Sequence, residues 1–124
     1  MKVKFLIALF CWTVLGRAVR TIDGDTFVAD FSVWHQTTAR ETVRVLGVDS
    51  PELRGKTREK GAEAKKFTQA WLAKGEFYIN TCKRDAFGRI LGTVFRGSFS
   101  FPFKDIASEI LADDLIKSGH GVSR

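Results

Sequence analysis

The chain has 124 residues, 44% of them hydrophobic, with eleven Phe and three Trp. This length suits one domain, and the apolar share excludes a disordered chain. The net charge of +6 favours a polyanionic partner, although a solvated basic surface is an equally valid reading of the charge alone.

The chain opens with a basic start and an apolar run, over residues 1–15. The run is too short for a membrane-spanning helix, but it resembles the first part of a signal peptide. We favour a retained first strand from Trp12 to Ile22, which keeps the protein in the cytoplasm. A cleaved signal would instead place it in the periplasm or outside the cell. We expect one domain over residues 16–124, with no membrane span.

Short alternating segments separated by turn residues fill the first half of the chain. Asp23 and Gly24 predict a tight turn, and residues 26–33 read as the partner strand of a hairpin. A polar connection over 35–40 leads to a third strand at 42–48. This first half therefore predicts a three-stranded meander.

The second half mixes helical and strand patterns. A basic loop over 53–60 precedes a helix at 61–73, whose apolar side chains recur on one face. Strands are expected at 76–81 and 89–96, with a turn at 85–88 between them.

A Phe-rich loop at 99–103 and a last helix at 105–117 complete the chain, with Asp105 as the expected N-cap. The order of elements predicts an α+β, mainly β fold. We expect a five-stranded Greek-key barrel of the OB type with two helices.

The cysteines, Cys11 and Cys82, form no metal-binding pattern, so we do not expect a zinc site. We favour two buried thiols. One disulfide in an oxidising compartment is the alternative.

Five charged side chains read together as a site for cutting a phosphodiester bond: Asp25, Arg44, Asp49, Glu52 and Arg89. Three carboxylates can hold a hard cation and orient a water, and two guanidiniums can hold a phosphate. Arg44 and Asp49 point to opposite faces of an ideal strand, so they meet only where the strand bends or bulges.

Four ordered stretches carry a resemblance to a known family: 19–27, 43–52, 61–67 and 87–92. They resemble the thermonuclease, or staphylococcal nuclease-like, family. The resemblance implies an OB-fold phosphodiesterase that uses Ca²⁺ to hydrolyse DNA and RNA with low sequence specificity, leaving 3′-phosphate ends.

The resemblance also implies a metal site. Asp25 and Asp49 correspond to carboxylate ligands of Ca²⁺, and the backbone carbonyl of Ser50 corresponds to a further ligand. Asp23 and Thr26 correspond to residues that support the waters of the metal.

The catalytic roles follow in the same way. Glu52 resembles the residue that orients or deprotonates the attacking water, and Arg44 and Arg89 resemble the two phosphate-binding arginines. The family often has Lys-Tyr where this chain has Ala86 and Phe87, so the contacts to a second phosphate differ.

Additional nucleic-acid contacts are expected from basic and aromatic side chains near these motifs: Arg54, Lys56, Lys83, Arg84 and Phe87. Because an OB groove with aromatic residues suits unstacked bases, we expect single-stranded substrates. We also expect the protein to be a monomer. A non-catalytic OB module that binds nucleic acid or a protein remains the alternative function.

Overall fold

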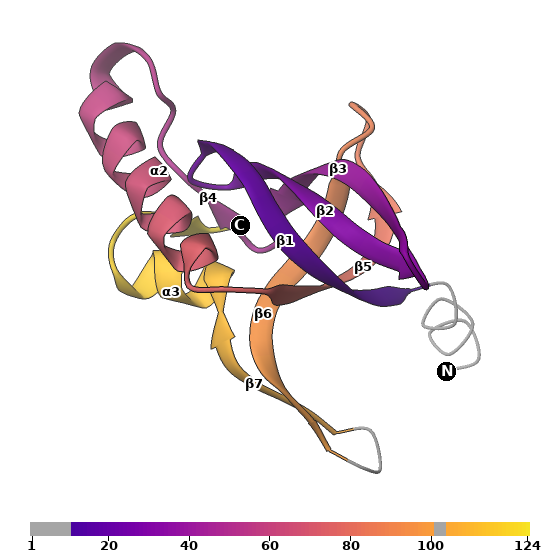
Figure 1. The fold of residues 1–124 in the computed structure, drawn as a ribbon. Helices are drawn as coiled ribbons and strands as arrows, with labels where there is room; N and C mark the ends of the chain where they lie inside the picture. The colour runs from indigo at the N-terminus through magenta and orange to yellow at the C-terminus, as the bar shows by residue number, and fades with distance from the viewer. Residues whose placement is uncertain (1–10, 101–103) are drawn as a thin grey trace, which may run out of the picture.

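The computed structural model describes residues 11–100 and 104–124 (Figure 1). Its elements are β1 (Trp12–Asp23), β2 (Thr26–Trp34), β3 (Thr37–Val45), β4 (Val48–Asp49), η1 (Gly55–Thr57), α2 (Arg58–Ala73), β5 (Phe77–Arg84), β6 (Ile90–Ser100), β7 (Lys104–Ile110), α3 (Leu111–Lys117) and β8 (Val122–Ser123).

The main sheet closes into a barrel. Its strands follow the order β3-β2-β1-β5-β6-β7, and β3 also pairs in parallel with β6, from Val43 opposite Ile90 to Val45 opposite Gly92. Five strands thus form the barrel, while β7 extends it from β6. The predicted mainly β, OB-type barrel with two helices is confirmed.

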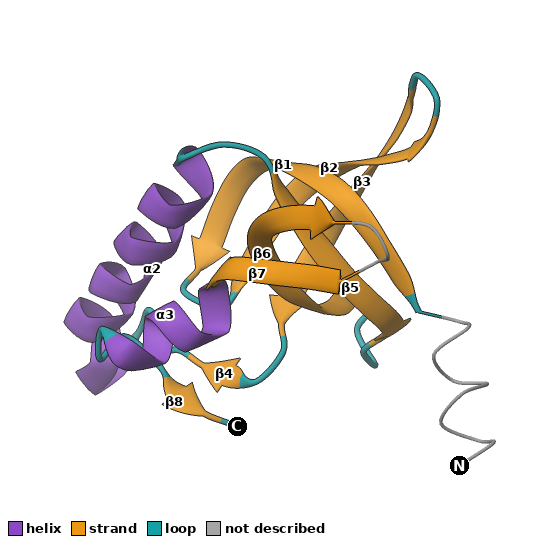
Figure 2. Ribbon diagram, turned by 90° about the horizontal axis from the view of Figure 1, so that it is seen from below, coloured by secondary structure: helices purple, strands orange, loops and turns teal. Residues whose placement is uncertain are grey.

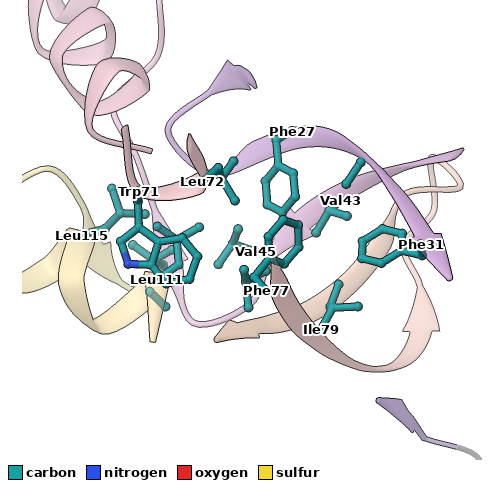
Figure 3. Close-up of a cluster of buried hydrophobic side chains, with 14 residues drawn as sticks. Phe27, Phe31, Val43, Val45, Trp71, Leu72, Phe77, Ile79, Leu111 and Leu115 are labelled. Atoms are coloured by element: carbon teal, nitrogen blue, oxygen red, sulfur yellow. The ribbon is translucent and has the colours of Figure 1, made fainter. Parts of the chain in front are cut away.

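Phenylalanine rings fill the barrel interior (Figure 3). Phe77 meets the rings of Phe27 and Phe31 edge-on, with centroids 5.6 and 6.1 Å apart. Gly16 lies against the Phe31 ring, where a Cβ atom would approach within 2.7 Å of one ring carbon. Burial of each such ring contributes about 2–3 kcal/mol, so alternation of aromatic residues stabilises the barrel.

Both helices cover one end of the barrel (Figure 2). The helix α2 buries Ala64, Thr68, Trp71 and Leu72. The indole N–H of Trp71 donates to Asp114 of α3 over 2.8 Å, which ties the two helices together.

The predicted start of the last helix was wrong. Residues 104–110 form strand β7, which pairs with β6, and α3 begins only at Leu111. Asp105 is therefore opposite Phe99 in a hairpin and does not cap a helix. The apolar spacing of residues 105–110 also suits a helix, but pairing with β6 outweighs this local preference. The expected loop at 99–103 was wrong for its first two residues, because β6 extends to Ser100, and residues 101–103 lie outside the described part of the chain.

Other boundaries moved without changing the topology. The third strand begins at Thr37 rather than residue 42, because a tight turn replaces the expected polar connection. His35 adopts a positive φ of 27° in that turn. The first helix begins at Arg58, three residues earlier than expected.

The cysteines do not form two buried thiols, so that prediction was wrong. Cys11 and Cys82 form a disulfide with their Cα atoms 4.0 Å apart. It joins the start of β1 to β5, across a separation of 71 residues. The first strand begins at Trp12 as expected, and the residues before Cys11 lie outside the described part of the chain. No helix within the described ranges has the length and hydropathy to span a membrane.

Candidate active site

The turn between β1 and β2 forms the first wall of the site. Its apex packs on neighbouring segments, since a Cβ on Gly24 would lie 2.6 Å from the Ser50 Cβ and 2.8 Å from the Ala64 Cβ. The Thr68 hydroxyl of α2 donates to the Gly24 carbonyl over 2.6 Å. Because only glycine fits there, the helix can hold this turn at a fixed position.

Asp25 follows directly and is only 8% exposed. Its Oδ1 accepts from the Thr26 hydroxyl at 3.0 Å, and its Oδ2 accepts from the Ser50 backbone N–H at 2.9 Å. Burial opposes its ionisation. Hydrogen bonds with Asp23 and from Ser50, and then the charge of Arg44, nevertheless hold the pKa of Asp25 below its ordinary value.

Arg44 joins the two predicted metal ligands. It is 7% exposed, and its Nη2 lies 3.4 Å from Asp25 Oδ2 and forms a short ion pair with Asp49 Oδ1. The strand ends at Val45, and Gly47, with a φ of 85°, turns the chain into β4. The predicted bend between Arg44 and Asp49 is therefore present as a tight turn.

Asp23 adds a further carboxylate at the edge of this cluster. Its Oδ1 accepts from the Asp25 backbone N–H at 3.1 Å. Burial, followed by its hydrogen bond and repulsion with Asp25, raises the pKa of Asp23 to about 6. Asp23 and Asp25 thus form a hydrogen-bonded pair of carboxyl groups beside Arg44.

Asp49 is fixed by the last strand of the described chain. Asp49 pairs with Val122 of β8, and Arg124 Nη1 lies 3.2 Å from Asp49 Oδ1. The Arg124 backbone N–H also donates to the Gly47 carbonyl. Sequence reasoning missed Arg124, because no motif links it to residues 75 positions earlier.

Arg89 occupies a turn organised by Asp85. One Asp85 oxygen accepts from the backbone N–H groups of Phe87 and Arg89, each at 2.9 Å, and the other accepts from Arg89 Nε at 2.6 Å. Burial opposes its ionisation, but these hydrogen bonds, led by that from Arg89, hold the pKa of Asp85 below its ordinary value. Phe87 is 84% exposed, and its ring centroid lies 5.5 Å from the Arg89 guanidinium carbon.

Arg44 and Arg89 line one pocket of about 290 Å³, together with Arg124. The predicted pair of arginines therefore shares one cavity, although the two side chains come from opposite sides of the β3–β6 seam.

Glu52 has an exposed side chain, which forms no ion pair with the cluster among the described residues. Its backbone is nonetheless fixed, because its carbonyl accepts from the Thr57 hydroxyl at 2.9 Å and packs against Gly61 at a distance that excludes a Cβ. Arg54 and Lys56 are exposed in the same loop.

Lys83 and Arg84 line a different pocket, of about 530 Å³, beside Cys82. Arg84 forms a bidentate ion pair with Glu41, including one short contact, and donates to the Gly88 carbonyl at 2.9 Å. The structure therefore does not bring these two cations to the pocket of Arg44 and Arg89.

The chain is similar in sequence to known proteins. The profile of the family described as staphylococcal nuclease homologue matches residues 42–123, two thirds of the chain. An Escherichia coli protein described as an uncharacterized endonuclease is 31% identical over 101 residues. That alignment covers 75% of this chain but only 59% of the relative's length.

Proposed function

Because the chain belongs to the staphylococcal nuclease family, we propose that it is a Ca²⁺-dependent endonuclease acting on DNA or RNA. It would act as a monomer with low sequence specificity, favour single strands and leave 3′-phosphate ends. The observation that carries this proposal is the meeting of Asp25, Arg44 and Asp49 at one corner, beside the pocket shared with Arg89.

The donor chemistry at this corner fits a hard cation. Among the described residues no three His, Cys, Asp or Glu side chains converge, so two carboxylates would be supplemented by oxygen donors of other kinds. Asp25, Asp49 and the Ser50 carbonyl would hold the ion, with Asp23 and Thr26 beside them. A bound Ca²⁺ would neutralise phosphate charge and favour ionisation of a bound water.

The side chains of this protein would do the remaining work. Glu52 would orient the attacking water or accept its proton, since its side chain is exposed to solvent while its backbone is fixed. Arg44 and Arg89 would stabilise the charge that develops on the phosphate as the 5′-oxygen leaves. Exposed Phe87 could stack on a base and so favour unpaired strands.

Digestion of single-stranded DNA by the purified protein tests the proposal. Cleavage should require Ca²⁺ and stop with excess chelator, and Arg89→Ala should lose about 10²-fold in rate or more. Arg17→Ala is the matched control, because Arg17 is an exposed arginine that does not line this pocket and pairs with Glu76 at 3.7 Å. No cleavage by folded, Ca²⁺-saturated protein would contradict the proposal and favour a non-catalytic binding module.

A further inference from the structure

The arginines of the site differ in how many of their donors are already in use. Arg44 donates through Nη1 to the Val45 and Val48 carbonyls, each at 2.8 Å, while its Nη2 faces the Asp25 and Asp49 carboxylates. Four acceptors therefore surround its two terminal nitrogens. Two of these acceptors, Asp25 and Asp49, are the carboxylates that would hold the ion, so Arg44 supports the metal ligands while its side chain also lines the pocket.

Arg89 and Arg124 are oriented differently. Each is held by one carboxylate at a single nitrogen, Arg89 through Nε to Asp85 and Arg124 through Nη1 to Asp49. Within the described part of the chain, the Nη atoms of Arg89 and Nη2 of Arg124 contact no other hydrogen-bond acceptor. Both guanidiniums line the same pocket of about 290 Å³ and remain partly exposed.

The charges that line this pocket are unbalanced. Three guanidiniums, from Arg44, Arg89 and Arg124, share it with one carboxylate, from Asp85. Leu46, Phe87 and Leu91 supply an apolar rim. Asp25 and Asp49 pair with Arg44 and Arg124 from beyond this lining. A small cavity with several guanidinium donors and an apolar edge suits a phosphate that carries a sugar or base.

We propose that Arg124 is a further substrate-binding residue, which joins Arg44 and Arg89 in a phosphate clamp at this site. The proposal rests on the nuclease function proposed above. Arg44, which is buried, also holds Asp25 and Asp49 in place. Arg124 reaches the clamp because β8 pairs with β4, and its contact with Asp49 links phosphate binding to the predicted metal ligand.

Binding measured without cleavage tests the clamp. A fluorescently labelled single-stranded DNA oligonucleotide is titrated with protein in excess chelator, and anisotropy gives Kd at several salt concentrations. Arg124→Gln should weaken binding about tenfold, because a direct phosphate contact is lost. The slope of log Kd against log salt should fall by about 0.7, the value for one phosphate contact on a single strand. Arg17→Gln is the matched control, and Arg124→Lys should recover part of the affinity, since it keeps the charge.

The outcomes separate the clamp from the function on which it rests. Equal affinity and equal salt slope for Arg124→Gln and Arg17→Gln, with normal binding by the unmodified chain, would overturn the clamp and leave the nuclease proposal standing. An unmodified chain that neither binds the oligonucleotide nor cleaves with Ca²⁺ would overturn both. Lost cleavage by Arg124→Gln with an unchanged salt slope would assign Arg124 only to support of Asp49 and would also overturn the clamp.

Discussion

At the scale of residues, the buried guanidinium of Arg44 holds the carboxylates of the site together. Arg44 has a side chain only 8% exposed, and its partner Asp25 has one 11% exposed. Buried ion pairs contribute little net stability, but loss of one partner leaves an uncompensated charge that costs about 3–5 kcal/mol. Arg44 therefore matters as much for keeping the two carboxylates together as for any contact with substrate.

Glu52 gives a sharp test of the chemistry. Glu52→Gln removes the carboxylate that would accept a proton, while the backbone contacts to Thr57 and Gly61 stay intact. Cleavage of single-stranded DNA with Ca²⁺ should fall by about 10²-fold or more, with oligonucleotide affinity nearly unchanged. Rates come from initial velocities and affinity from anisotropy in chelator. Glu63→Gln, an exposed glutamate on α2, serves as the control, and full activity of Glu52→Gln would remove Glu52 from the mechanism.

The sequence predicted part of this residue-level picture. The spacing of Arg44 and Asp49 required a bend, and the Gly47 turn supplies it. Arg124 could not be foreseen, because only the β4–β8 pairing brings it to Asp49. Short strands of two residues carry too little periodicity to be recognised in a sequence.

At the scale of elements, Arg96 of β6 completes the end of α2. Its side chain donates to the Gly75 and Glu76 carbonyls at 2.9 and 3.1 Å, just beyond the last turn. Its guanidinium carbon lies 4.1 Å from the centroid of the Trp71 ring. One side chain thus satisfies carbonyls at a helix C-terminus and covers the aromatic residue that anchors the helix.

Replacement of this side chain should destabilise the fold. Arg96→Ala should lower the free energy of unfolding by about 2–3 kcal/mol, because charged hydrogen bonds and a cation–π contact are lost together. Urea denaturation followed by Trp fluorescence measures the change. Arg96→Lys should lower the free energy of unfolding by less. Arg17→Ala, a substitution on an exposed part of β1, should leave it almost unchanged. A decrease in the free energy of unfolding below about 0.5 kcal/mol for Arg96→Ala would contradict this role, because ordinary surface substitutions cause changes of that size.

The element boundaries show where sequence patterns fail. The hairpin turn at Asp23 and Gly24 was predictable, because both residues favour tight turns. Residues 105–110 were not, since an apolar residue at positions 106 and 110 also matches helical spacing. Only the register with β6, which pairs Ile106 with Ser98 and Ile110 with Phe95, assigns them to a strand.

At the scale of the whole molecule, the Cys11–Cys82 disulfide joins distant parts of the barrel. By the chain-entropy model, closure of a loop with a separation of 71 residues stabilises the folded state by up to about 4 kcal/mol. A Cys11→Ser, Cys82→Ser double variant should lose stability on this scale, measured by urea denaturation under oxidising conditions.

Reduction of the disulfide distinguishes the effect of losing this bond from other effects of the two substitutions. Dithiothreitol should lower the stability of the unmodified chain toward that of the double variant, and it should leave the double variant unchanged. Equal stability of the unmodified chain with and without reductant would contradict the predicted contribution of the disulfide.

The β4–β8 pairing also has a consequence for synthesis of the protein. Asp25, Arg44 and Asp49 are translated early, but Asp49 gains its contacts with Val122 and Arg124 only when residues 122–124 have left the ribosome. Since chains fold from the N-terminus as they emerge, the barrel can begin to assemble well before the site is complete. The barrel strands and the contacts of Asp49 with β8 would therefore form at different stages of synthesis.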